Sequence, residues 1–168
     1  MKILIVSGFL GAGKTTFIKR LARNVDQRFA ILENEYGAAG IDGARLGQNR
    51  QGTQKNVWEM TEQCICCIGK KDFAASVLTI ANLVGPEYLI VEPTGVGSLA
   101  RIIENLRQIE YERIQLLSPV TIVDVYSYRR YMAEYPELYQ DQIRSADTII
   151  VSKTEACQAE EKQRIQKF

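Results

Sequence analysis

The sequence predicts an α/β fold in which helices cover both faces of a mainly parallel β-sheet. Short apolar runs alternate with longer segments whose apolar residues recur at helical spacing. Most of these runs are hydrophobic at every position, which is typical of strands buried on both faces by crossover helices. A glycine-rich loop joins the first apolar run to the first helical segment.

Composition agrees with one globular domain that has its own core. The chain has 168 residues, of which 46% are hydrophobic and 24% charged. The net charge of +1 gives no indication of a nucleic-acid or membrane partner. No apolar run approaches the roughly 20 residues of a membrane span, and a strand at residue 3 leaves no room for a signal peptide. We therefore expect a cytoplasmic protein.

The loop after the first strand, residues 3–6, has the sequence GFLGAGKT over residues 8–15. It matches G-x-x-x-x-G-K-[ST], the P-loop, whose backbone N–H groups surround a phosphate at a helix N-terminus. Lys14 is expected to bridge the β- and γ-phosphates, and the Thr15 hydroxyl to ligate Mg²⁺. A glycine-rich turn without a ligand would need neither side chain. The predicted phosphate-binding residues are Gly11, Ala12, Gly13, Lys14, Thr15 and Thr16.

The second strand is expected at residues 29–32, followed by an acid-rich end and a long glycine-rich loop over residues 37–52. This loop suits a nucleotide-sensing switch, although a flexible loop without function would have the same composition. A further short strand is expected at residues 57–60.

Three cysteines, Cys64, Cys66 and Cys67, form a C-x-C-C motif. Thiolates are soft ligands that favour Zn²⁺, Cu(I), cobalt or nickel. Because the chain has no histidine, a fourth donor would be a carboxylate, a water or a group of a partner. A redox pair or inert buried thiols are the alternatives. The candidate carboxylates are Glu33, Glu35, Asp42 and Glu62.

A helix is expected at about residues 72–84, with Asp72 as its N-cap and Gly85-Pro86 as its end. The buried strand that follows, residues 88–91, leads into Glu92. An acid at this end of a buried strand lies where open α/β sheets bind ligands. We expect Glu92 to hold Mg²⁺, directly or through water, or to orient the attacking water. A purely structural glutamate is the alternative.

The remaining elements complete the alternation. A helix capped by Ser98 precedes a strand at residues 120–125, and a helical segment at 126–145 is interrupted by Pro136. Its tyrosines are expected to be packing and surface residues. The last strand, residues 148–151, is followed by a polar helix that runs to Phe168.

Residues 152–155, SKTE, lie where guanine-binding P-loop proteins have N-K-x-D. There a carboxylate accepts hydrogen bonds from guanine N1–H and the exocyclic amine, and the lysine stem covers the base. We expect Ser152, Lys153 and Glu155 to fill these positions. The alternative is a helix start capped by Ser152 and Glu155.

Together these motifs resemble the CobW branch of the CobW/HypB/UreG family of SIMIBI-class GTPases. The matching segments, in family order and spacing, are residues 8–16, 33–37, 64–67, 92–95 and 152–155. The resemblance implies a P-loop NTPase three-layer sandwich, and we expect residues 1–168 to form this domain but to lack a final strand and the family's C-terminal domain. Two positions differ from the family: Glu155 stands where an aspartate is usual, and Ala38 where many members have an acid.

The resemblance also implies a metal chaperone or metal-insertion protein that binds GTP or GDP with Mg²⁺ and hydrolyses GTP slowly. Its cargo would be Zn²⁺, Co²⁺ or Ni²⁺, bound through C-x-C-C under nucleotide control. A client metalloprotein or metal-cofactor enzyme and a nucleotide-linked homodimer are the implied partners. A small-molecule kinase and a non-catalytic nucleotide-sensing subunit are the competing functions. The implied catalytic residues are Lys14 and Glu92, and the implied metal ligands are Thr15, Glu92, Cys64, Cys66, Cys67, Glu33 and Glu35.

Overall fold

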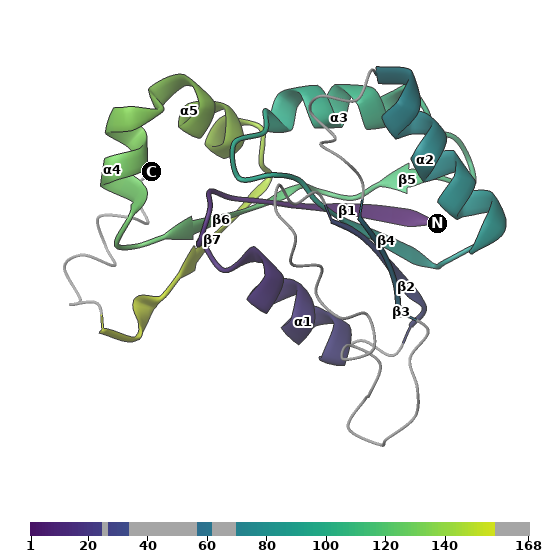
Figure 1. Cartoon of the computed structure of the whole chain (residues 1–168), viewed down its shortest axis with the longest axis horizontal. Helices are drawn as coiled ribbons and strands as arrows, with labels where there is room; N and C mark the ends of the chain where they lie inside the picture. The colour runs from purple at the N-terminus through teal and green to yellow at the C-terminus, as the bar shows by residue number, and fades with distance from the viewer. Residues whose placement is uncertain (25–26, 34–56, 62–69, 157–168) are drawn as a thin grey trace.

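The apolar runs form a parallel sheet, as the sequence predicts (Figure 1). The structure is a computed structural model that describes residues 1–24, 27–33, 57–61 and 70–156. Its strands are β1 (Lys2–Ser7), β2 (Phe29–Glu33), β3 (Val57–Thr61), β4 (Tyr88–Glu92), β5 (Gln115–Leu116), β6 (Val120–Asp124) and β7 (Thr148–Ser152). Its helices are α1 (Lys14–Asn24), α2 (Lys70–Leu83), α3 (Leu99–Arg107), α4 (Tyr128–Glu134), α5 (Pro136–Arg144) and the short 3₁₀ turn η2 (Thr154–Ala156).

The strand order is β3-β2-β4-β1-β6-β7, and every pair in it is parallel. The short β5, which the sequence did not predict, pairs with the beginning of β1. Parallel pairing places the carboxyl ends of the strands at one edge of the sheet, where ligands of open α/β sheets bind. The residues at these ends are Ser7, Glu33, Glu92, Asp124 and Ser152.

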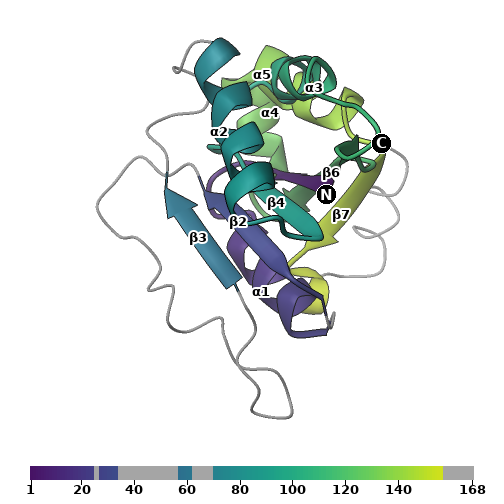
Figure 2. The same cartoon turned by 90° about the vertical axis from the view of Figure 1, so that its right-hand side faces the viewer.

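Helices cover both faces of the sheet, with α1 on one and α2 and α3 on the other (Figures 1 and 2). Successive residues of β1 point to opposite faces of the sheet, and each face is covered by different helices. Ile3 and Ile5 belong to the buried cluster that includes α2 and α3, whereas Val6 belongs to the cluster that includes Ile18 of α1. Burial of one such side chain contributes about 1.5–3 kcal/mol to folding. The predicted three-layer arrangement is confirmed.

A third buried cluster joins α4 and α5 to the loop that follows β1. Phe9 lies with its ring centroid 4.6 Å from that of Tyr131 and 5.1 Å from that of Tyr139. Tyr128 and Tyr139 are buried, whereas Tyr126 is exposed. The tyrosines of this segment are thus packing and surface residues, as expected.

The ends of the helices agree with the sequence except at α2. This helix begins at Lys70, so Asp72 lies inside its first turn and is not the N-cap that we predicted. Lysine is a good helix former, which allows the helix to include both Lys70 and Lys71. Gly85 ends α2 as predicted, with φ of +56° and its N–H 3.1 Å from the Ile80 carbonyl.

The predicted interruption at Pro136 and the predicted cap at Ser98 are both present. Pro136 is the first residue of α5, where its missing N–H leaves no helical hydrogen bond unmade. The Ser98 hydroxyl accepts from the Arg101 N–H at 3.3 Å. The glycine-rich loop and nearly all of the final polar helix lie outside the described residues.

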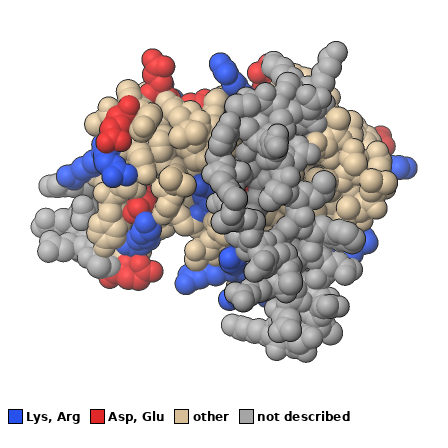
Figure 3. Space-filling view, in the orientation of Figure 1, with Lys and Arg blue, Asp and Glu red and all other residues tan. Residues whose placement is uncertain are grey.

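Basic and acidic side chains are interspersed among the described residues on the face shown in Figure 3. This distribution is consistent with the near-zero net charge. In the part of the chain that the structure describes, no helix combines the length and the hydrophobicity needed to cross a lipid bilayer.

Candidate nucleotide-binding site

The P-loop follows β1 and has the backbone shape that its glycines predict. Gly11 and Gly13 have φ angles of +75° and +97°, which side-chain-bearing residues rarely adopt. Gly8 also lies against the neighbouring strand β6, because a Cβ built on it would be 2.5 Å from the Ile122 carbonyl oxygen. The loop can therefore pack onto the sheet only with glycine at this position. Thr16 is exposed in the first turn of α1.

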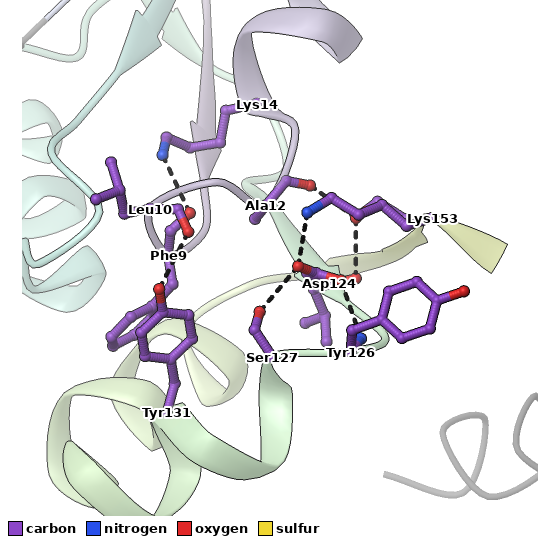
Figure 4. A network of polar contacts seen from close by, with 11 residues as sticks. Phe9, Leu10, Ala12, Lys14, Asp124, Tyr126, Ser127, Tyr131 and Lys153 are labelled. Atoms are coloured by element: carbon purple, nitrogen blue, oxygen red, sulfur yellow. Dashed lines mark hydrogen bonds and ion pairs between the residues drawn. The ribbon is translucent and has the colours of Figure 1, made fainter. Parts of the chain in front are cut away.

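Lys14, the first residue of α1, folds back over this loop (Figure 4). Its side chain is buried, and its ammonium donates a hydrogen bond to the Phe9 carbonyl at 3.4 Å. The positive charge thus lies beside the loop whose N–H groups would surround a phosphate. This is the placement that a lysine needs to neutralise bound phosphate.

Glu92 and Thr15 meet next to the P-loop, although they are 77 residues apart in the sequence. The Thr15 hydroxyl lies 3.2 Å from Oε1 and 3.3 Å from Oε2 of Glu92. Glu92 is 8% exposed at the end of β4. A hydroxyl and a carboxylate form the all-oxygen donor set that Mg²⁺ prefers, so these residues fit that ion.

The end of β7 is fastened to the P-loop. The Ser152 hydroxyl donates to the Ala12 carbonyl at 2.7 Å, and Ser152 is the last residue of the strand. In the alternative interpretation, the Ser152 hydroxyl would instead accept a hydrogen bond from a backbone N–H of a following helix. Glu155 lies in η2 and is exposed.

Lys153 has a left-handed backbone, with φ of +59°, which costs a non-glycine residue about 1–3 kcal/mol. Its ammonium donates to Oδ2 of Asp124 at 2.8 Å (Figure 4). Oδ1 of Asp124 accepts from the Tyr126 N–H at 2.9 Å, and Oδ2 also accepts from the Ser127 hydroxyl at 3.0 Å. The carboxylate therefore holds the side chain of Lys153 in place.

Burial of Asp124 opposes its ionisation, but the hydrogen bonds from Lys153, Tyr126 and Ser127, together with the charge of Lys153, outweigh that effect. The pKa of Asp124 is consequently lowered from its ordinary value. No sequence motif marks Asp124 as a site residue. The signal was nevertheless present, because Asp124 ends a buried apolar strand as Glu92 does.

The turn that follows Glu92 lies directly on the P-loop. A Cβ added to Gly95 would lie 2.5 Å from the Leu10 nitrogen and 3.0 Å from the Phe9 carbonyl carbon. Both are backbone atoms, which a side chain could not displace easily. The two loops therefore touch backbone to backbone at Gly95.

The predicted sulfur site falls outside the described residues, because Cys64, Cys66, Cys67 and Glu35 all lie there. Glu33 ends β2 and pairs in register with Glu92 of β4. Within the described ranges, no group of three or more cysteines and acids could hold a metal ion. The predicted metal ligands therefore stay a prediction.

The sequence pattern described as "CobW/HypB/UreG, nucleotide-binding domain" matches residues 2–168. The chain is 31% identical to the zinc chaperone YeiR of Escherichia coli (strain K12) over 167 residues, which cover 98% of this chain and 50% of that protein. It is 30% identical to the zinc chaperone CobW of a Sinorhizobium species over 182 residues, covering 92% of this chain and 51% of the relative. The chain thus spans about half the length of these relatives.

Among solved structures, the Zn(II)-bound YjiA GTPase from E. coli has the same fold. The TM-score is 0.69 at 23% sequence identity, over 99% of this chain and 53% of that chain. This likeness supports the three-layer arrangement of the elements described above.

Proposed function

Because this chain belongs to the CobW/HypB/UreG family through its nucleotide-binding domain, we propose that it is a GTP-dependent metal chaperone or metal-insertion protein. It binds GTP, hydrolyses it slowly, and uses the nucleotide to control a thiophilic divalent metal. The observation that carries the proposal is the meeting of the P-loop with Glu92 and with Ser152 at one edge of the sheet, next to Lys153. The names of two relatives, both zinc chaperones, support zinc over cobalt or nickel as cargo.

The phosphates would be bound by N–H groups of Gly11, Ala12 and Gly13 and by the N-terminus of α1. Lys14 would exchange its contact with the Phe9 carbonyl for the β- and γ-phosphates. Thr15 and Glu92 would hold Mg²⁺, which neutralises charge on the phosphates. Alternatively, the Glu92 carboxylate would orient the attacking water.

The base would be read by Lys153 and Glu155. The carboxylate of Glu155 can accept the two hydrogen bonds that guanine N1–H and its exocyclic amine donate, whereas adenine lacks this donor pair. Lys153, fixed by Asp124, provides an aliphatic stem to cover the base. We therefore propose a preference for GTP over ATP.

The metal cargo would be bound by Cys64, Cys66 and Cys67, with a carboxylate such as Glu33 or Glu35 as a further ligand. Glu33 ends β2, and the other residues belong to the segments that follow β2 and β3 in the sequence; the carboxyl ends of both strands are at the proposed nucleotide edge of the sheet. A γ-phosphate can order loops at that edge, and hydrolysis releases them. The proposed partners are a client metalloprotein or metal-cofactor enzyme and a second copy of the chain in the triphosphate state.

The test is a competition titration of Zn²⁺ against a chelator, first with GDP and then with a non-hydrolysable GTP analogue. Metal should bind roughly 5- to 150-fold more tightly in the triphosphate state. Replacing Cys66 and Cys67 by serine should remove the tight site, and Cys157→Ser is the matched control. Equal zinc affinities in the two nucleotide states would refute the metal-chaperone proposal.

A further inference from the structure

Helix α5 reaches the turn between Glu92 and α3 through one buried side chain. The amide Nε2 of Gln142 donates to the carbonyl of Gly95 and to that of Gly97, each at 3.1 Å. Gln142 is only 1% exposed. Both hydrogens of one amide group are therefore used to hold two carbonyls of a single turn.

Gln142 is itself held firmly. The Thr121 hydroxyl on β6 donates to its backbone carbonyl at 2.9 Å, which fixes α5 to the sheet. The neighbouring Asp141 accepts at Oδ2 from the Leu99 N–H at 2.7 Å and from the Ala100 N–H at 3.4 Å. These contacts fix the first residues of α3, so the turn is anchored to α5 at its middle and at its far end.

The same pair of helices also supports the P-loop. The Tyr131 hydroxyl of α4 donates to the Leu10 carbonyl at 3.3 Å (Figure 4), and the Phe9 ring packs against the rings of Tyr131 and Tyr139. Because Gly95 touches the backbone of Phe9 and Leu10, the turn cannot approach the P-loop more closely. The two hydrogen bonds from Gln142 tie the turn to α5 and oppose its movement away from this position.

We propose that Gln142 is a positioning residue for GTP hydrolysis: it fixes the turn that continues from Glu92 against the P-loop. The inference rests on the proposed hydrolysis of GTP. Among the residues that the structure describes, Gln142 makes its hydrogen bonds with Gly95, Gly97 and Thr121, outside the proposed phosphate-binding residues 11–16 and base-binding residues 152–155. Its loss should therefore lower turnover while the affinity for GDP stays the same.

The test compares Gln142→Met with Gln140→Met. Methionine has nearly the length and volume of glutamine but no amide, and Gln140 is a partly exposed residue on the same helix. Gln142→Met should lower kcat roughly tenfold, the size expected for the loss of one or two hydrogen bonds, and leave the Kd for GDP unchanged. Gln140→Met should alter neither. If Gln142→Met does not fold, Gln142→Asn, which is one methylene too short, gives the same test.

Hydrogen exchange provides a readout that does not depend on hydrolysis. The Gly97 N–H donates to the Thr94 carbonyl at 3.0 Å inside the turn, so its exchange with solvent reports opening of the turn. Its exchange should be about fivefold faster or more in Gln142→Met and unchanged in Gln140→Met.

The outcomes separate the two proposals. If the wild-type chain does not hydrolyse GTP, the proposed function fails. The inference about Gln142 is then judged by hydrogen exchange alone, and it is overturned if the Gly97 N–H exchanges at the same rate in Gln142→Met and Gln140→Met. If the unchanged chain hydrolyses GTP, an unchanged kcat in Gln142→Met overturns the inference. A loss of GDP affinity as large as the loss of kcat also overturns it, because Gln142 would then support the P-loop as a whole.

Discussion

Asp124 connects β6 to Lys153 of the proposed base-binding segment, and Asp124→Asn is the substitution that tests this connection most directly. Asp124 accepts three hydrogen bonds at 2.8–3.0 Å, from Lys153, the Tyr126 N–H and the Ser127 hydroxyl. Asparagine keeps the shape but has no charge. It also replaces one accepting oxygen by an NH₂ group that would face a donor.

The loss of folding stability in Asp124→Asn can be worked out from these contacts. A hydrogen bond to a charged group contributes about 1.5–3 kcal/mol, but the Lys153 side chain is 47% exposed, so solvent weakens that pair. Because asparagine still accepts at one oxygen, we expect a loss of about 2 kcal/mol in the free energy of unfolding at pH 7. Without its partner Lys153 no longer has a fixed place, and GDP affinity should fall roughly tenfold.

The lowered pKa of Asp124 gives this prediction a pH dependence. The folded chain ionises Asp124 more readily than the unfolded chain, in which the pKa has its ordinary value of 3.8. The stabilisation is therefore fully present above that value and is lost as the pH falls through the lower folded pKa. The difference in stability between the parent and Asp124→Asn should thus be constant from pH 7 to about pH 5 and shrink below pH 4.

Urea unfolding followed by circular dichroism measures the stability, and fluorescent GDP measures the affinity. Asp147→Asn is the control, because Asp147 is an exposed aspartate just before β7. The reasoning is refuted if Asp124→Asn matches Asp147→Asn in both unfolding midpoint and GDP affinity, since the carboxylate would then neither stabilise the fold nor position Lys153.

Three further predictions concern the loops and the tyrosine cluster. Lys14→Ala should abolish tight nucleotide binding, whereas Glu92→Gln should spare GDP binding and lower turnover. If Lys14→Ala releases phosphate from GTP at the wild-type rate, the assignment of the P-loop as the phosphate-binding site is wrong. Gly95→Ala should lower stability by about 1–3 kcal/mol and turnover with it, because its Cβ would lie 2.5 Å from the Leu10 nitrogen; unfolding and hydrolysis identical to the parent would show that the turn has room. Tyr139→Phe should be neutral or stabilising by up to about 1 kcal/mol, because within the described residues the buried Tyr139 hydroxyl has no hydrogen-bond partner. Burial, followed by the nearby Asp124 and Tyr128, raises the pKa of the Tyr139 hydroxyl to about 12, so the substitution removes no charge at neutral pH. A large fall in the thermal unfolding midpoint of Tyr139→Phe would contradict the expectation.

The sequence by itself determined the fold class, the order of the strands and helices along the chain apart from the short β5, and the presence of the P-loop motif. These features are local: an apolar run, a helical repeat or a glycine-lysine-threonine pattern is complete within about 15 residues. The same locality explains why Gly85, Ser98 and Pro136 marked helix ends correctly. It also explains the error at Asp72, because a capping residue is recognisable only when the helix does not extend past it.

The tertiary structure decided which distant residues meet. Sheet order and register bring Thr15 to Glu92 across 77 residues, and Lys153 to Asp124 across 29. Gln142 looks in the sequence like any glutamine of a polar helix, and only the packing of α5 turns its amide toward Gly95 and Gly97. Such contacts depend on how whole elements pack, and a side chain's partner in space leaves no periodic signal in its own neighbourhood.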